Sequence, residues 1–150
     1  MDTKPHDALV ILKLYELRGE ALMRSARAWF FSEFNPQSGR EIVALLQSGE
    51  KQSAYYRMVA SHWEVAAALV NTGGIDENMF LAANTEHLVV FAKLQPFVAE
   101  IRETIGEPDY LANLEQLVTR APNVEKKLEN RRRLIGRWLQ PATPVVLGTA

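Results

Sequence analysis

The chain contains no cysteine, which excludes disulfide bonds, thiolate metal sites and a cysteine nucleophile. Long hydrophobic runs are also missing. The longest uninterrupted apolar stretch, residues 65–70, is far shorter than the roughly 18 residues that span a bilayer. The first apolar run, residues 8–12, is too short for the core of a signal peptide, and neither end carries a lipidation motif. We therefore expect a cytoplasmic protein with no membrane span.

Motifs that announce a reaction or a phosphate site are absent as well. The sequence has no GxGxxG fingerprint, no P-loop, no GxSxG elbow and no EF-hand loop. Asn-Gly and Asp-Gly hairpin dipeptides are also missing. Hydrophobic residues make up 47% of the 150 residues and the net charge is only −1, which argues against disorder. The sequence predicts an ordinary globular domain and offers no sign of an enzyme.

The sequence is instead dominated by helical patterns, with apolar residues spaced by three and four. The predicted helices cover residues 5–34, 38–49, 51–71, 77–83, 85–106, 108–121 and 123–140. These segments indicate an all-α fold, a helical bundle of about five to seven helices with two long antiparallel core helices. We expect residues 1–140 to form a single all-helical domain. Residues 141–150 form a C-terminal extended tail, because Pro141 and Pro144 prevent a helix there, and this tail is apolar enough to dock on a neighbouring chain.

The first predicted helix carries one apolar stripe that we expect to face the core. Its members are Leu12, Tyr15, Gly19, Leu22, Ala26 and Trp29. Glycine costs about 1 kcal/mol relative to alanine inside a helix. The presence of Gly19 on this stripe therefore predicts that another helix crosses closely at that point.

Several helix ends have local signals. Ser38 and Glu41 fit a capping box, and Asp76 is an expected N-cap residue. Pro96 lies inside an apolar pattern that continues through it, which predicts one kinked helix ending at Gly106.

Three histidines occur singly, at His6, His62 and His87. No two potential ligands lie one helical turn apart in the HExxH, ExxH or HxxxH spacing that metal sites favour. We therefore expect no metal and no other cofactor, although single histidines from separate helices can still converge. A hydrogen-bonded histidine at the core or its boundary is the favoured interpretation of His62.

A line of polar residues follows the least polar helix, residues 51–71. Arg57, Ser61, Glu64 and Asn71 share one face. If this face points inward, Glu64 needs a cationic partner such as Arg57 or Arg102, because an unpaired buried carboxylate is costly. The candidate polar site is therefore Arg57, Ser61, Glu64 and Arg102. It is either a carboxylate at the base of a small pocket or a solvated stripe with structural ion pairs.

Aromatic residues are dense in the first half of the chain. They are Trp29, Phe30, Phe31, Phe34, Tyr55, Tyr56 and Trp63. Such side chains can line a ligand cavity, but they more often fill the crossing between two helices. Core packing is the favoured interpretation.

The charge distribution is uneven. Residues 123–140 hold six basic and two acidic residues, a net charge of +4, in a chain whose net charge is −1. The basic residues are Lys126, Lys127, Arg131, Arg132, Arg133 and Arg137. A basic helix can contact nucleic-acid phosphates or an anionic membrane surface, and it can equally bridge to acidic parts of its own fold or of a second subunit. Nucleic acid is the less favoured partner, because the chain has no phosphate loop and no recognisable helix-turn-helix.

One part of the sequence resembles a pattern in uncharacterised bacterial helical proteins that are catalogued as domains of unknown function. In this pattern an aromatic residue and a glutamate precede a glycine turn and Ile-Asp, and a later helix carries proline and arginine. The matching positions are Trp63, Glu64, Gly74, Ile75, Asp76, Pro96 and Arg102. The resemblance implies an all-helical fold without assigning an activity, and it makes Glu64 and Arg102 the pair of most interest.

Three functions are compatible with these observations. The favoured one is a non-enzymatic helical interaction protein that forms a homodimer through the faces of long helices, which predicts a contiguous exposed apolar surface. The second is a small-ligand-binding protein or enzyme with a pocket around Glu64. The third is a binder of nucleic acid or an anionic surface through the basic helix of residues 123–140.

Overall fold

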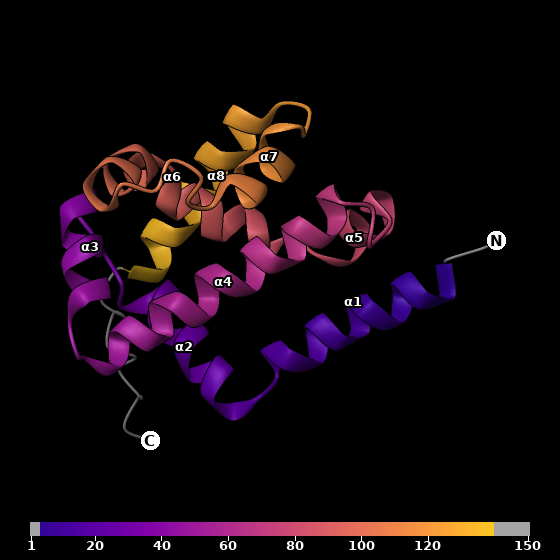
Figure 1. The fold of residues 1–150 in the computed structure, drawn as a ribbon, viewed down its shortest axis with the longest axis horizontal. Coiled ribbons are helices and arrows are strands. Elements are labelled where there is room, and N and C mark those ends of the chain that lie inside the picture. The colour runs from indigo at the N-terminus through magenta and orange to yellow at the C-terminus, as the bar shows by residue number, and fades with distance from the viewer. Residues whose placement is uncertain (1–3, 140–150) are drawn as a thin grey trace, which may run out of the picture.

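The computed structural model describes residues 4–139, and within this range it contains helices and no strands (Figure 1). The helices are α1 (Lys4–Arg18), α2 (Ala21–Ser32), α3 (Gly39–Gln47), α4 (Lys51–Asn71), α5 (Glu77–Ala83), α6 (Glu86–Ile105), α7 (Ala112–Thr119) and α8 (Val124–Leu139). The all-α fold is confirmed, but the described residues form eight helices rather than five to seven. The expected tail, residues 141–150, lies outside the described residues.

The core lies around α4, which packs against α2, α3 and α7, while α8 covers α6 and also touches α2. The largest side chains with no more than trace exposure are Trp63, Tyr56, Phe30, Phe80 and Phe91. The two longest helices are α4 and α6. Their antiparallel pairing as the core of the bundle stays a prediction. None of the helices in residues 4–139 is long and apolar enough to cross a membrane.

The first predicted helix is in fact two helices, α1 and α2, which meet at a sharp turn (Figure 1). The Gly19 N–H donates to the Glu16 carbonyl oxygen at 2.9 Å, and Glu20 takes extended angles of φ −64° and ψ 145°. A Cβ at Gly19 would meet the Glu16 carbonyl oxygen at 3.2 Å and no other helix. Gly19 therefore marks a helix end, and the predicted helix crossing at this residue is wrong.

A close helix crossing does occur at another glycine. A Cβ at Gly39, the first residue of α3, would lie 2.8 Å from the Glu100 Cβ and 3.0 Å from the Phe97 carbonyl oxygen. The missing side chain therefore allows α3 to approach α6. The sequence does not reveal this role, since Gly39 lies inside what looks like an ordinary capping box.

The predicted inward stripe of the first helix is also wrong for its first four members. Leu12, Tyr15 and Leu22 are exposed, whereas α1 buries Asp7, Ile11 and Leu14. Ala26, further along the stripe in α2, is buried as expected. The helix α1 is apolar on two sides, and its tertiary contacts with α5 and α2 decide which side faces inward.

Local capping signals are confirmed. The Ser38 Oγ accepts the Glu41 N–H at 3.1 Å, while the Glu41 carboxylate accepts the N–H of Gln37, one residue earlier than a standard capping box. The Asp76 carboxylate accepts the Met79 N–H at 2.8 Å. The helix α6 continues through Pro96 and ends at Gly106, whose φ of 70° lies in the left-handed region.

Candidate functional site

The outward side of α1 is the most exposed apolar surface of the described residues. We call it the α1 outer face, and it consists of Leu9 (65% exposed), Leu12 (61%) and Tyr15 (67%), while Leu22 (58%) is exposed at the start of α2. Figure 1 shows α1 running along one side of the molecule. Large apolar side chains gathered on one face are typical of protein–protein contact sites.

The opposite side of α1 attaches the helix to the body. Ile11 and Leu14 are buried, and the Asp7 carboxylate accepts the Asp76 N–H at 2.9 Å. At the end of α1, the Arg18 guanidinium lies 5.1 Å from the centre of the Trp63 ring of α4. These contacts hold α1 in one orientation, with the α1 outer face directed away from the body.

The Glu86 carboxylate joins four helices through polar contacts, and we call this arrangement the Glu86 network. Arg27 of α2 donates to Glu86 from Nη2 at 2.6 Å and from Nε at 3.0 Å. The buried Trp63 indole N–H of α4 donates at 3.1 Å, and Arg18 of α1 lies 3.7 Å away. Both oxygens of the Glu86 carboxylate therefore accept hydrogen bonds, from the Arg27 guanidinium and the Trp63 indole. Hydrogen bonds to a charged acceptor such as this one are strong.

His62 of α4 lies beside the Glu86 network and contacts Trp63. Burial lowers the pKa of His62 to about 4, and the positive charge of Arg18 adds to this effect. Its ring packs edge-on against Trp63, with the centroids 4.8 Å apart. His62 lies at the core boundary as predicted, but its Nε2 is buried with no hydrogen-bond partner among the described residues. The expected hydrogen bond is therefore not found at this nitrogen.

A pocket of about 660 Å³ opens next to the Glu86 network, between α2, α8 and the start of α6. We call it the arginine pocket. Its polar side chains include Arg18, Arg27, Glu86 and Arg131, and its apolar walls include Phe31, Val89, Leu134 and Trp138. This combination of a charged end and apolar walls is typical of sites for small organic molecules.

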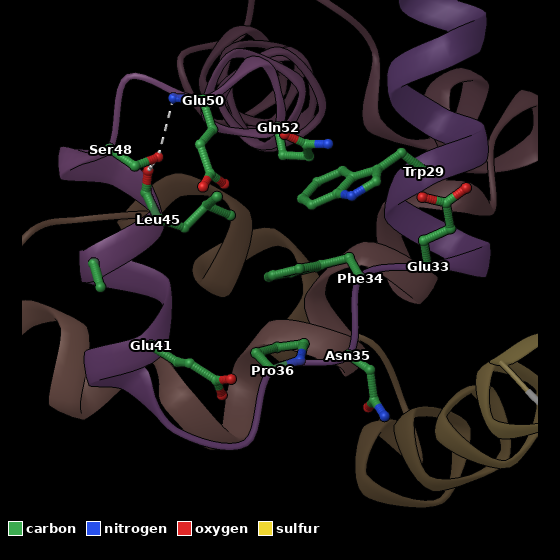
Figure 2. A pocket seen from close by; sticks show the side chains of 11 residues that line it. Trp29, Glu33, Phe34, Asn35, Pro36, Glu41, Leu45, Ser48, Glu50 and Gln52 are labelled. Carbon is green, nitrogen blue, oxygen red and sulfur yellow. Dashed lines mark hydrogen bonds between the residues drawn. The ribbon is translucent and has the colours of Figure 1, made fainter.

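A second pocket, of about 440 Å³, lies between α2, α3 and the start of α4. Figure 2 shows the side chains of Trp29 and Phe34 lining this pocket, with the carboxylates of Glu33, Glu41 and Glu50 around it. The two rings are stacked with their centroids 4.8 Å apart. The three carboxylates come from separate segments and are exposed, and no group of His, Asp or Glu side chains in residues 4–139 has the arrangement of a metal site.

Comparison with known proteins gives one match. The sequence model of a family described as "Domain of unknown function (DUF4760)" matches residues 4–121. The chain belongs to this family. No curated protein and no solved structure matches the chain. The DUF4760 match confirms the resemblance to a family of unknown function, and it covers α1 to α7 and ends before α8.

The predicted polar site does not form a single cluster in this DUF4760 protein. The Glu64 carboxylate accepts the backbone N–H groups of Leu114 at 2.8 Å and Asn113 at 3.2 Å. Arg102 instead donates to the Tyr110 carbonyl oxygen and pairs with Glu115 at 3.1 Å. Glu64 and Arg102 thus hold α7 and the turn before it from two sides, and no ion pair joins these two residues in the described structure.

The other two members of the predicted polar site lie at the surface of α4. Arg57 is exposed, and its Nε donates to the Ser53 carbonyl oxygen at 3.3 Å. Ser61 is also exposed. Neither side chain has a hydrogen bond to Glu64 within residues 4–139.

The predicted basic surface on α8 is divided by the fold. Arg132 turns toward α6, where its Nη1 donates to the Gln95 side chain at 3.0 Å and the Ala92 carbonyl oxygen at 3.2 Å. Arg133 pairs with Glu129 on the same exposed face at 2.9 Å. Arg131 is half-buried at the arginine pocket. The remaining members, Lys126, Lys127 and Arg137, are exposed.

Lys93 of the DUF4760 fold is a buried cation that the sequence did not indicate. Its Nζ donates to the Phe30 carbonyl oxygen at 2.5 Å, and it lies 5.1 Å from the ring centres of Phe30 and Phe34. Burial lowers its pKa to about 8. Its contact near the last turn of α2 is a favourable position for a cation at a helix C-terminus.

The aromatic set is divided between core and pocket. Phe30, Tyr56 and Trp63 are fully buried, which confirms core packing for them. Trp29 and Phe34 also line the pocket of Figure 2.

The sequence analysis did not predict the Glu86 network. Arg27 and Glu86 are 59 residues apart, and no local spacing links them.

Proposed function

We propose that this DUF4760 protein is a non-enzymatic helical interaction protein of the cytoplasm that forms a homodimer through the α1 outer face. The observation that carries the proposal is that α1 has apolar side chains on two sides. One side packs on the body through Ile11 and Leu14, whereas Leu9, Leu12 and Tyr15 are each more than half exposed. When a helix carries apolar residues on two sides, both sides are usually covered by other protein segments.

The size of this surface supports a functional contact. Leu9, Leu12 and Tyr15 together expose an area on the order of several hundred Å², which is comparable to the largest apolar patch of a typical monomer. Two such patches pressed together approach the lower limit of a specific interface, roughly 1,000 Å² in total. We therefore expect a dimer that dissociates on dilution.

A second copy is the proposed partner because the surface can pair with itself. In an antiparallel pairing about a two-fold axis at Leu12, Leu9 of each copy faces Tyr15 of its partner. The face is bordered by exposed side chains of both signs, Lys13 and Glu16. These two side chains lie 3.9 Å apart on the same helix, so they compensate each other's charge beside the apolar face.

Leu12→Glu is the variant that tests the proposal, because it introduces two carboxylates at the axis of the dimer, where like charges repel. We expect sedimentation velocity to give a concentration-dependent dimer for the wild-type protein at about 100 μM, a concentration well above a micromolar Kd. The Leu12→Glu protein is expected to sediment as a monomer at the same concentration. Circular dichroism checks that the variant keeps its helices.

Leu81→Glu is the matched control, since Leu81 is an exposed leucine (40%) on α5, outside the α1 outer face. This control is expected to remain dimeric. A wild-type protein that is monomeric at this concentration overturns the proposal. Equal dissociation of the two variants overturns it as well, because the effect would then not belong to α1.

A further inference from the structure

The arginine pocket contains more positive charge than its one carboxylate neutralises. Arg18, Arg27 and Arg131 line it together with Glu86. Arg27 binds Glu86 through a two-nitrogen fork, and Trp63 donates to the second oxygen. The Glu86 network is therefore complete without Arg131, and the pocket keeps a local charge of two positive units.

Two guanidinium groups of the arginine pocket, those of Arg18 and Arg131, are partly buried and have few hydrogen-bond partners. The Arg18 Nε is buried with no hydrogen-bond partner among the described residues. Arg131 is half-buried, and within residues 4–139 no hydrogen bond or ion pair joins it to another residue. Arg131 thus has no counter-ion, and Arg18 has only a carboxylate that already binds Arg27, at a distance of 3.7 Å. Partly buried guanidinium groups with so little compensation are costly, and an anion that supplies oxygen acceptors relieves this cost.

The remainder of the pocket is apolar. Phe31 and Trp138 meet edge to face with their centroids 5.7 Å apart, and Val89 and Leu134 complete the wall. The pocket volume of about 660 Å³ lies within the usual range for small-molecule sites. The walls therefore suit a flat hydrophobic group attached to the anion.

We infer that the arginine pocket binds a small organic dianion, a phosphate monoester with a flat apolar body, through Arg131 and Arg18. The phosphate matches the net charge of two positive units that three arginines and one glutamate give the pocket, and it accepts forked hydrogen bonds from guanidinium groups. The apolar body lies against Phe31 and Trp138. This site is separate from the α1 outer face, so it goes beyond the homodimer proposed above.

The test is isothermal titration calorimetry on the full chain with 1-naphthyl phosphate as the probe. Inorganic phosphate tests binding of the phosphate group alone, and 1-naphthol tests binding of the naphthyl group alone. We expect 1-naphthyl phosphate to bind with a Kd below about 1 mM and at least about tenfold more tightly than either fragment, because both halves of the pocket are then filled.

Arg131→Gln removes the unpaired guanidinium and leaves the Glu86 network complete. We expect it to weaken binding of 1-naphthyl phosphate by about tenfold or more, in line with the loss of a charge-assisted contact. Ala83→Trp places a large side chain at the pocket lining from an exposed position and is expected to abolish binding. Thermal melting checks that both variants remain folded.

Arg24→Gln is the matched control, because Arg24 is exposed on α2 and is not among the residues that line the arginine pocket. It removes the same charge and is expected to bind the probe as the wild type does. The monomeric Leu12→Glu protein is also expected to bind normally, so failure of the dimer leaves this test intact. No binding to the wild type, equal binding to Arg131→Gln, or equal binding of inorganic phosphate would each overturn the inference.

Discussion

His87 of α6 is only 1% exposed, and neither of its ring nitrogens has a hydrogen-bond partner among the described residues. Burial lowers its pKa from 6.5 to about 4, and the positive charge of Arg131 acts in the same direction. The ring packs between Phe80 and Trp63, at centroid distances of 5.2 Å and 5.9 Å. At neutral pH His87 therefore behaves as an uncharged aromatic side chain in the core.

This burial predicts a dependence of stability on pH. In the unfolded chain His87 takes up a proton as the pH falls below about 6.5, whereas in the folded protein it does so only near pH 4. The unfolded state binds more protons in this window, so the free energy of unfolding decreases as the pH falls from 7 to 4. The loss of unfolding free energy that His87 causes reaches about 3 kcal/mol near pH 4.

The variant that tests this dependence is His87→Phe, which keeps an aromatic ring and removes the titrating group. Urea unfolding at pH 7 and pH 4.5 is expected to show a smaller loss of stability for His87→Phe than for the wild type. His6→Gln changes an exposed histidine and is expected to keep the wild-type loss. Equal losses for His87→Phe and the wild type would contradict the prediction.

Among the helices, α7 depends on another helix for its N-terminal cap. Its own N-cap residue, Leu111, has a φ of 57° and offers no side-chain hydrogen bond. The Glu64 carboxylate of α4 accepts the N–H groups of Asn113 and Leu114 in its place. A carboxylate at this end of a helix also interacts favourably with the helix dipole. Glu64 therefore connects α4 to α7 by the chemistry of an ordinary cap.

Glu64→Ala removes this cap and is expected to lower the free energy of unfolding by about 1–2 kcal/mol, the range measured for the loss of N-cap side chains. Urea denaturation measures the change. Glu103→Ala provides a control of the same chemistry, since Glu103 is exposed on α6. If both variants lose the same stability, Glu64 has no special capping role.

At the scale of the whole molecule, the Glu86 network joins α1, α2, α4 and α6 at one carboxylate. The Glu86 side chain is only 15% exposed, and its partners Arg18 and Arg27 are 13% and 29% exposed. Partly buried ion pairs are costly to break, because the remaining charges lose their partner without regaining full hydration. The fold therefore depends on this residue more than on any ion pair at its surface.

Glu86→Gln keeps a hydrogen-bond acceptor for Trp63 but removes the charge that faces two arginines. We expect it to lower the free energy of unfolding by about 2 kcal/mol or more. Glu77→Gln is the matched control, because it breaks the exposed ion pair with Arg120 and is expected to cost less than about 1 kcal/mol in solvent-screened surroundings. Chemical denaturation of both variants makes the comparison, and a control as damaging as Glu86→Gln would contradict it.

Much of the fold could be predicted because its signals are local. The helix of residues 51–71 has the predicted bounds, and Ser38, Asp76 and Gly106 mark helix ends as expected. The break at Gly19 was not predicted because the apolar stripe continues across it, and Leu12, Tyr15 and Leu22 of this stripe face solvent. Of the candidate site, Glu64 was expected to pair with Arg57 or Arg102, and Arg131 was assigned to a basic surface. The structure instead places Glu64 at the start of α7 and Arg131 at the arginine pocket, because their neighbours come from distant segments.

The sequence by itself determined the helical class, most helix boundaries and the basic character of α8, because these follow from spacing and from residues within a few positions of each other. Only the tertiary structure decided which side of α1 is exposed, that Glu64 caps α7, and that Arg18, Arg27 and Arg131 meet beside Glu86. The physical reason is that a helix pattern constrains neighbours along the chain. The contacts that create a face, a cap or a pocket depend instead on how separate helices pack.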